Sequence, residues 1–166
     1  MKKIVSLLLA VLLIATFGAF ALGSGESDEK AEQGSGTAEG KADNNETIGD
    51  YSVVIDSCRL AKDFEDKPVV IVKYIFTNNK NDDATAFYVA FEDKVYQDGV
   101  GLNNAYILKD SANYNSENQT KAIKKGASLE VEVAYELNDT ETDIEVEVKE
   151  FISLNDKVIS KTFSIK

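Results

Sequence analysis

Apolar and polar residues alternate along much of the chain from residue 48 to residue 166, and this period of two predicts β-strands. In segment 129–137 every second residue is apolar and most residues between are glutamates, and segment 144–148 repeats the pattern. Each segment therefore has one face to bury and one acidic face for solvent. If the two strands are neighbours, a register that opposes Glu132 to Lys149 is favoured because it limits contacts between like charges; otherwise they belong to different sheets.

A nearly continuous apolar run, Val69–Phe76, predicts a central strand that is covered on both faces except at Lys73. Pro68 sits at its first position, where a missing N–H is tolerated. In the preceding segment, 51–60, the apolar phase changes near Asp56–Ser57, which predicts a β-bulge there.

Two hairpins are predicted from turn residues and cross-strand pairing. Asp98-Gly99 favours a type I′ turn because glycine adopts positive φ without steric cost, and Asn155-Asp156 is a possible two-residue loop. The first hairpin would place every second residue of Phe87–Phe91 on an inner face. Its predicted pairs are Val95–Leu102, Phe91–Tyr106 and Val89–Leu108. The pairs predicted for the second hairpin are Ile152–Ile159, Glu150–Lys161, Val148–Phe163 and Val146–Ile165.

Seven such strands, separated by turn residues, predict a two-sheet sandwich for residues 48–166. The expected fold class is all-β, an immunoglobulin-like β-sandwich of about seven antiparallel strands. The Cys-Trp-Cys core of antibody domains is absent, since the chain has one cysteine and no tryptophan.

Residues 1–21 have the organisation of a signal peptide. Lys2 and Lys3 supply positive charge, residues 4–20 are apolar, and Ala19 and Ala21 form the small-x-small site that a signal peptidase cleaves. The alternative is a retained signal-anchor, because this apolar segment is long enough to span a bilayer. A retained anchor is the one membrane association that the sequence predicts.

Residues 22–47 consist largely of Gly, Ser, Ala, Glu and Asp and contain no aromatic residue. Such a segment cannot bury enough apolar surface to fold. It predicts a disordered acidic linker that would hold the following domain away from any anchor.

Composition narrows the possible chemistry. The chain of 166 residues has 18 Lys plus Arg against 29 Asp plus Glu, a net charge of -11, and no histidine. With Cys58 as the only cysteine, Ser-His-Asp and Cys-His catalysis, imidazole metal sites and internal disulfides are excluded. The acidity argues against nucleic acid and anionic lipid surfaces as partners. No cofactor is expected.

The order of four sequence blocks carries a family resemblance. The blocks are GDYSVVIDSCRLAKDFEDKPVVIVKYIFTNN, TAFYVAFEDKVYQDGVGL, IKKGASLEVEVAYELNDT and IEVEVKEFISLNDKVISKTFSI. Over residues 48–166 this order resembles an extracellular immunoglobulin-like domain family of secreted bacterial proteins, domain of unknown function 5067. The resemblance implies a sandwich on the outer side of a bacterial membrane, and it brings no catalytic residues and no known ligand.

Calcium is the most specific metal hypothesis for this sequence, because calcium sites use oxygen ligands and need no histidine. Two Asn/Asp-rich segments, 78–83 and 138–143, are the loops to consider. Neither has the spacing of an EF-hand, and such clusters also form ordinary turns. The candidate ligands are Asp82, Asp83, Asp139, Glu141 and Asp143.

Three other features each have a functional and a structural interpretation. Cys58 is either a reactive thiol or, as we favour, a small buried residue. The acidic strand faces are either a surface for a cation or a basic partner or, as we favour, solvated faces. Tyr96, Tyr106 and Tyr114 are either an aromatic patch for a glycan or a protein, or core residues.

Two classes of function remain. The favoured one is a secreted or cell-surface, non-catalytic, immunoglobulin-like module of the bacterial cell envelope that binds an unidentified extracellular protein or glycan, with a calcium-binding module as a variant. The alternative is a glycan-acting enzyme with paired carboxylates, since Asp and Glu are the only abundant acid–base groups. A concave pocket holding two carboxylates would favour the enzyme.

Signal-peptide cleavage after Ala21 predicts a mature protein that begins at Leu22. Intact-mass spectrometry of the protein recovered from its cells checks this, because cleavage removes the whole segment 1–21. Recovery of the full-length mass alone would show that the segment is retained as an anchor.

Overall fold

The computed structural model describes residues 37–38, 46–81, 83–107, 113–154 and 156–166. The chain divides into two compact units, Met1–Glu32 and Gln33–Lys166, and the fold below is that of the second. Three of the predictions lie outside the described residues, namely the signal peptide with Ala19 and Ala21, most of the linker, and the calcium candidate Asp82.

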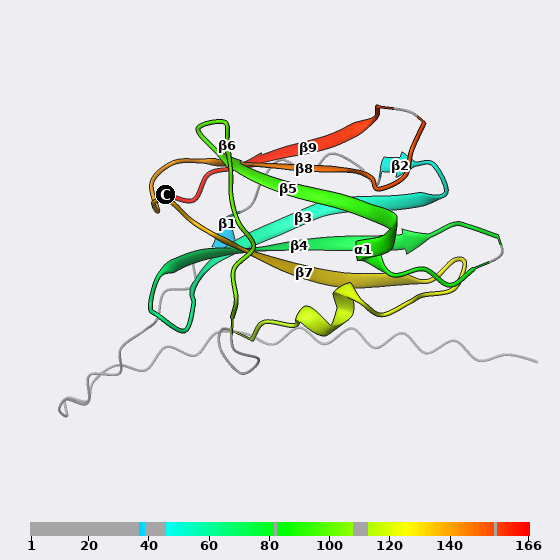
Figure 1. Cartoon of the computed structure of the whole chain (residues 1–166), viewed down its shortest axis with the longest axis horizontal. Helices are drawn as coiled ribbons and strands as arrows, with labels where there is room; N and C mark the ends of the chain where they lie inside the picture. Colours follow the sequence, from blue (N-terminus) through cyan, green and yellow to red (C-terminus); the bar gives the residue numbers. More distant parts are fainter. Residues whose placement is uncertain (1–36, 39–45, 82, 108–112, 155) are drawn as a thin grey trace, which may run out of the picture. The chain divides into compact units, whose positions relative to one another are not determined.

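Two antiparallel sheets form the second unit (Figure 1). In the first sheet the order is β1-β3-β4-β7, with β2 also paired to β3, and in the second it is β6-β5-β8-β9. Seven of the described strands have three or more residues, which confirms the predicted all-β sandwich. The strands are β1 (Thr37–Ala38), β2 (Glu46–Ile48), β3 (Tyr51–Lys62), β4 (Pro68–Asn78), β5 (Phe91–Gln97), β6 (Val100–Gly101), β7 (Ser128–Glu136), β8 (Ile144–Glu150) and β9 (Val158–Phe163).

The connections between these strands follow the immunoglobulin pattern. In the first sheet β3, β4 and β7 take the positions of strands A, B and E. In the second sheet β6, β5, β8 and β9 take the positions of strands C′, C, F and G. The described part of the connection 102–127 forms no continuous strand D along the outer edge of β7. The path of this connection determines the candidate site.

Aromatic side chains fill the space between the sheets. Tyr51 of β3 and Phe76 of β4 both meet Phe91 of β5, with ring centroids 5.8 Å apart in each pair. Phe87 contacts Phe76 and Phe91 from the turn before β5. All four rings are buried, so the two sheets share one apolar core.

β4 is a central strand, as its apolar run predicts, because it pairs with β3 on one side and β7 on the other. Its residues Val69–Val72 are fully buried, and Pro68 begins the strand. The predicted bulge in β3 is also confirmed, since the register with β4 shifts between Ile55 and Ser57.

Lys161 of β9 connects the second sheet to this bulge. Its Nζ donates to the backbone oxygens of Ile55, at 2.9 Å, and Asp56, at 2.8 Å, and lies 4.7 Å from the centroid of the Phe163 ring. The ammonium therefore supplies hydrogen-bond donors where the bulge interrupts the strand ladder. A lysine that points inward from an edge strand also discourages pairing with another chain.

The turn at Asp98-Gly99 has positive φ at both residues, 47° and 73°, as a type I′ turn requires. Tyr96 pairs with Gly101 in the predicted register. The predicted extension to Phe91 and Tyr106 is wrong, because β6 ends at Gly101 and the chain then crosses to β7 of the other sheet. The Asp98-Gly99 turn therefore fixes where the hairpin begins, but it does not fix how long the paired strands are.

Residues 87–90 form a single helical turn, α1 (Phe87–Ala90), where the sequence predicted a strand. Phe87 and Ala90 are buried, whereas Val89, predicted to face inward and to pair with Leu108, is exposed. In a helical turn the residues that share a face are three or four apart, so a period of two fails here. The other helical element is the 3-10 turn η1 (Ser116–Gln119), and no helix among the described residues has the length and apolar character needed to cross a membrane.

β8 and β9 pair as predicted, but in a different register. Val148 lies opposite Ile159 and not opposite Phe163, and the other predicted pairs shift by the same amount. β8 ends at Glu150 and β9 begins at Val158, so the connecting loop is longer than two residues; in this loop the Phe151 amide donates to the Ala90 carbonyl of α1. The shift is an even number of residues, so the same side chains face the core.

β7 and β8 lie in different sheets, which is the second of the two arrangements that their acidic faces allow. Parts of the predicted linker also belong to the first sheet. β1 pairs with Cys58 and Arg59 of β3, and β2 begins at Glu46. Within segment 22–47, these described residues are held to the first sheet by backbone pairing with β3.

A hydrogen bond between a phenol and a carboxylate joins the sheets near the core. The hydroxyl of Tyr135 on β7 donates to Asp93 Oδ2 on β5. Burial raises the pKa of Asp93, and the hydrogen bond from Tyr135 opposes that rise. The Tyr74 hydroxyl is buried close to both groups, and burial raises its pKa.

We expect an Asp93→Asn variant to change how stability depends on pH. Because the pKa of Asp93 is raised on folding, its contribution to the free energy of unfolding is fully present below the unfolded pKa and is lost as pH rises through the folded pKa. Asparagine removes this titration and still accepts the Tyr135 hydroxyl. Urea unfolding between about pH 3 and pH 8 should show wild-type stability falling relative to the variant as pH rises; a constant difference would contradict the assignment.

Candidate functional site

Short backbone contacts and side-chain amides cover the outer edge of β7 in place of strand D. At the end of β7 the contacts come from the backbone of residues 103–105, and near its start they come from side chains of η1. Between the two groups of contacts the chain leaves the strand. The hydrogen bonds are Ala105 N to Ala134 O (2.8 Å), Glu136 N to Asn103 O (2.9 Å), Gln119 Nε2 to Glu132 O (2.6 Å) and Asn118 Nδ2 to Glu130 O (2.9 Å).

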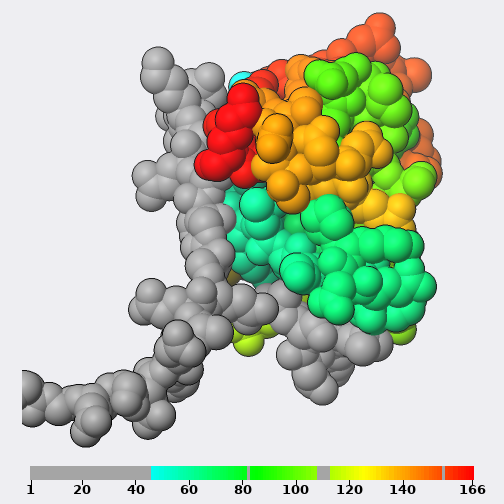
Figure 2. Space-filling view, turned by 90° about the vertical axis from the view of Figure 1, so that its left-hand side faces the viewer, coloured from blue at the N-terminus to red at the C-terminus, as the bar shows by residue number. Residues whose placement is uncertain are grey.

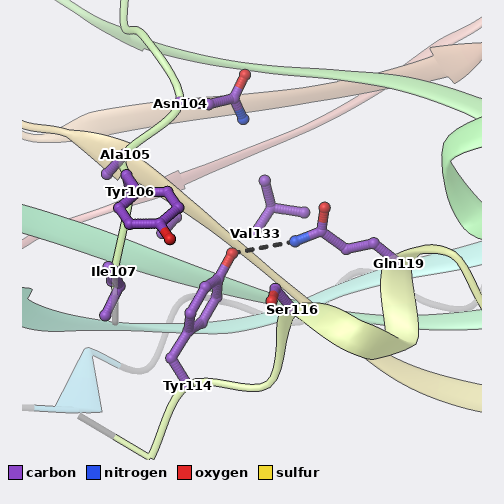
Figure 3. Close-up of a pocket in the computed structure, with 9 residues that line it drawn as sticks. Asn104, Ala105, Tyr106, Ile107, Tyr114, Ser116, Gln119 and Val133 are labelled. Atoms are coloured by element: carbon purple, nitrogen blue, oxygen red, sulfur yellow. Dashed lines mark hydrogen bonds between the residues drawn. The ribbon is translucent and has the colours of Figure 1, made fainter. Parts of the chain in front are cut away.

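A pocket of about 320 Å³ lies where the chain leaves the β7 edge (Figure 3). Segment 104–107 forms one wall, residues 114–119 form the other, and β7 lies between them. None of the described lining residues is charged. They are Asn104, Ala105, Tyr106, Ile107, Tyr114, Ser116, Gln119, Val133 and Ala134.

The side chains of Tyr114 and Gln119 are hydrogen-bonded to each other, and Gln119 is also hydrogen-bonded to the edge of β7. Gln119 Nε2 donates to the Tyr114 hydroxyl oxygen at 3.0 Å and to the Glu132 carbonyl at 2.6 Å. Both amide hydrogens of Gln119 are thereby used, which leaves its Oε1 as an acceptor. The Tyr114 oxygen already accepts, which leaves its own hydrogen to donate. Burial raises the pKa of Tyr114, so this hydroxyl stays protonated at neutral pH.

Asn104, Tyr106 and Ser116 add further polar groups to the pocket. In Figure 3 the Asn104 amide and the Tyr106 hydroxyl lie around the same space as Tyr114 and Gln119. Among the contacts that the structure describes, none of these three added side chains takes part in a hydrogen bond. The pocket thus presents uncharged donors and acceptors that the protein itself does not use.

An ion pair beside the pocket anchors the wall that carries Tyr114. Arg59 of β3, the only arginine of the chain, donates to both carboxylate oxygens of Glu132 on β7, at 2.5 and 3.2 Å. The same carboxylate accepts the Asn115 N–H at 3.0 Å, and Arg59 reaches the Asn113 carbonyl at 3.4 Å. The two charged side chains are only 23% and 15% exposed. One bidentate pair therefore links two strands and the pocket wall.

A second apolar cluster packs beneath this wall. Val69 and Ile71 of β4 and Ala134 of β7 lie on the outer face of the first sheet and pack against Ile107 and Tyr114. β4 is therefore covered on both faces: one face contacts the core between the sheets and the other contacts this cluster. This second contact is the physical reason for the unbroken apolar run in β4.

Two exposed aromatic rings meet at the rim of the pocket. Phe64, from the β3–β4 loop, is 59% exposed, and Tyr106 is 71% exposed. Their ring centroids are 6.2 Å apart with an interplanar angle of 79°, which is an edge-to-face contact. This contact limits the orientations of Tyr106 and leaves aromatic surface open beside the polar lining.

A second, smaller hollow of about 150 Å³ contains the side chains that the enzyme hypothesis requires. It is lined by Glu92, Lys94, Tyr96, Glu147, Lys149 and Val158. Glu92 accepts from Lys149 at 2.8 Å and from Lys94 at 2.9 Å, and these hydrogen bonds lower its pKa. A carboxylic acid that protonates a glycosidic oxygen needs a raised pKa, which is the opposite shift.

The predicted calcium ligands lie at two different ends of β4. Asp83 is exposed in the loop that follows β4. Asp139, Glu141 and Asp143 follow β7, which is antiparallel to β4, so their loop lies at the other end of the sheet. Figure 2 shows that end of the domain, with this loop in orange. The two predicted loops therefore cannot contribute to one shared site.

The Asp139 carboxylate is used within its own loop. Its Oδ1 accepts the N–H groups of Glu141 and Thr142, and its Oδ2 accepts the Thr142 hydroxyl; these bonds lower its pKa. Buried Gln97 binds the backbone of the same loop at Asn138, Asp139 and Thr142. Within the described part of the chain, no three acidic or cysteine side chains are placed to hold a metal ion. The local geometry is that of a hydrogen-bonded turn.

The structure favours the structural interpretation of Cys58 and separates the three tyrosines. Cys58 is buried, and burial raises its pKa to about 11, which leaves the thiol protonated and unreactive at neutral pH. Tyr106 and Tyr114 line the pocket beside β7, as an aromatic ligand patch requires, but Tyr96 lines the second hollow.

Sequence reasoning did not identify Asn104, Ser116, Gln119 or the Arg59–Glu132 pair as site residues. Each is an ordinary surface residue type, and they come from four separated segments. The one available signal was the concentration of Asn, Ser and Gln around Tyr114 in a domain otherwise made of strands.

The family model described as "domain of unknown function (DUF5067)" matches residues 26–150. The chain belongs to the DUF5067 family. The match begins upstream of residue 48, where the sequence resemblance begins, and ends with the last residue of β8. It confirms the predicted family, and its description assigns no ligand and no reaction.

Two solved structures resemble this DUF5067 chain. A "putative lipoprotein" from Staphylococcus aureus subsp. aureus NCTC 8325 is 22% identical with a TM-score of 0.50, and the alignment covers 75% of this chain and 94% of that one. A "putative lipoprotein" (ycdA) from Bacillus subtilis subsp. subtilis str. 168 is 16% identical with a TM-score of 0.55, covering 73% of this chain and 38% of that one. At these identities the likeness shows the fold alone. Comparison with curated proteins gives no match.

Replacing Glu132 with Gln should loosen the pocket wall. The variant removes the charge that pairs with Arg59, and we expect a loss of about 1–2 kcal/mol in the free energy of unfolding, between the values for exposed and buried ion pairs. The Asn115 amide should exchange its hydrogen faster, because its acceptor becomes weaker. Urea unfolding and amide exchange by NMR measure the two effects. Glu130→Gln, an exposed glutamate on the same strand, is the matched control, and equal effects in both variants would contradict this role of Glu132.

Proposed function

We propose that this DUF5067 domain is a non-catalytic binding module on the outer side of the bacterial cell envelope, and that the pocket beside β7 holds its ligand. The single observation that carries the proposal is the set of polar side chains at Asn104, Tyr106, Tyr114, Ser116 and Gln119. They line one pocket, and their remaining donors and acceptors have no partner among the described contacts. Convergent unused polar groups in a concavity are what a ligand site requires.

The chemistry of the pocket supports binding without catalysis. Among the described residues that line it there is no carboxylate, amine or thiol, so these residues offer no group to transfer a proton or attack a substrate near neutral pH. Two acidic side chains in contact with β7 are engaged elsewhere: Asp93 accepts from Tyr135, and Glu132 is bound by Arg59 and the Asn115 N–H.

The location outside the cytoplasm is supported by two independent features. The N-terminal segment has the charge pattern, apolar length and Ala19-x-Ala21 site of a signal peptide. Both structural neighbours are described as a "putative lipoprotein", and lipoproteins are proteins of the cell envelope.

The test is a titration of the full-length, isotope-labelled protein in mild detergent, followed by NMR. Three probes are added in turn: a neutral trisaccharide, an anionic trisaccharide, and an uncharged extended pentapeptide. We expect at least one probe to shift the backbone amides of Ala105, Ser116 and Gln119, which border the pocket.

A Ser116→Trp variant fills the pocket and should weaken that binding by at least about tenfold, equivalent to 1.4 kcal/mol. Ser116 is exposed, so the larger side chain is compatible with folding, and a melting curve verifies this. Ser160→Trp, at an exposed position on β9, is the matched control and should bind within about twofold of wild type. Absence of pocket shifts with all three probes would refute the proposed site.

A further inference from the structure

We infer that the ligand of this pocket is a neutral saccharide, with Tyr106 as the ring against which a sugar packs. The inference rests on the proposed function, since it names the chemical class bound at that same site. Three features of the described residues carry it: the absence of charge in the lining, the occupied backbone edge of β7, and the exposed aromatic pair at the rim.

The lining selects against charged ligands. An anion would need a cationic partner, and the nearest arginine, Arg59, is already bound by both carboxylate oxygens of Glu132. A cation would need a carboxylate, and none of the described residues that line the pocket supplies one. Burying an unpaired charge costs roughly several kcal/mol of binding free energy. A few neutral hydrogen bonds contribute less than this. The preferred ligand is therefore uncharged.

The edge of β7 is not available to an extended peptide. A peptide that adds to a sheet needs unpaired backbone N–H and C=O groups along the edge strand. On β7 the carbonyls of Glu130, Glu132 and Ala134 already accept hydrogen bonds, and the N–H of Glu136 already donates one. With these groups occupied, a peptide strand cannot form a continuous ladder of backbone hydrogen bonds along the edge of β7.

A sugar hydroxyl both donates and accepts, and the pocket offers matching groups. Tyr114 presents a hydrogen to donate, Gln119 presents Oε1 to accept, and Asn104 and Ser116 can do both. The volume of about 320 Å³ lies at the lower end of the range for small-molecule pockets. A short stretch of glycan fits this chemistry, with the rest of the chain continuing into solvent.

The aromatic pair provides the apolar part of such a site. A pyranose ring has faces of C–H groups, which pack against aromatic rings through dispersion and weak C–H contacts. Tyr106 is 71% exposed at the pocket rim, and its edge-to-face contact with Phe64 restricts its motion before a ligand arrives. A restrained aromatic ring loses little conformational entropy on binding.

The experiment measures affinity of the full-length protein for two neutral trisaccharides, chitotriose and maltotriose, by calorimetry. We expect at least one to bind, with affinity that changes by less than about twofold between 50 and 500 mM NaCl, because no ion pair forms and salt screens only charges. The anionic tri-galacturonate and the uncharged pentapeptide should bind at least about tenfold more weakly, a difference of 1.4 kcal/mol.

Substitutions at Tyr106 separate packing from hydrogen bonding. Tyr106→Ala should weaken saccharide binding by about tenfold, whereas Tyr106→Phe, which keeps the ring, should stay within about threefold of wild type. Phe151→Ala is the matched control, because Phe151 is 58% exposed at a distant loop between β8 and β9 and should leave affinity unchanged.

Each outcome has a definite meaning. Binding of the pentapeptide or the anionic sugar at the pocket, with no binding of either neutral trisaccharide, overturns the saccharide inference and leaves the proposed binding function standing. Saccharide binding that is unaffected by Tyr106→Ala also overturns the inference. If no probe shifts the pocket amides, both the inference and the proposed function are refuted.

Discussion

The outer edge of β7 is the constraint on which the rest of this structure depends. An edge strand presents a row of backbone N–H and C=O groups that must find partners or invite another chain. Immunoglobulin-like sandwiches usually place a fourth strand here. In this domain the backbone of residues 103–105 and the amides of Asn118 and Gln119 satisfy the edge in two separate places. The space between them becomes the pocket.

Replacing a strand with side chains makes the site depend on contacts far apart in sequence. The Arg59–Glu132 pair joins β3 to β7 and positions the wall through Asn113 and Asn115. Beneath the wall, Tyr114 contributes its ring to the outer apolar cluster while its hydroxyl faces the pocket. The same residue therefore links stability of the sheet face to the chemistry of the site.

Polar contacts also connect the two sheets outside the aromatic core. Lys161 binds the carbonyls of the β3 bulge, and Tyr135 binds Asp93 across the sandwich. Both polar groups have partners, which limits the cost of placing them near apolar surroundings. The remaining acidity lies largely on exposed strand faces and in the loop built around Asp139, where carboxylates contact solvent, lysines or backbone amides. The described residues that line the pocket, in contrast, carry no charge.

The sequence by itself determined the fold class, the family, the central position of β4, the bulge in β3 and the Asp98-Gly99 turn. Each of these depends on local patterns, namely side-chain alternation, an unbroken apolar run and the positive φ that glycine allows. Tertiary structure decided the register of β8 and β9, the helical turn at Phe87–Ala90 and the pocket, because each depends on a contact between distant segments. The Phe151 amide binds the Ala90 carbonyl of α1 beyond the end of β8, and the pocket needs segments 104–107 and 114–119 to converge on the edge of β7. Local periodicity contains no information about these long-range contacts, because they depend on how the whole chain forms hydrogen bonds with its backbone groups.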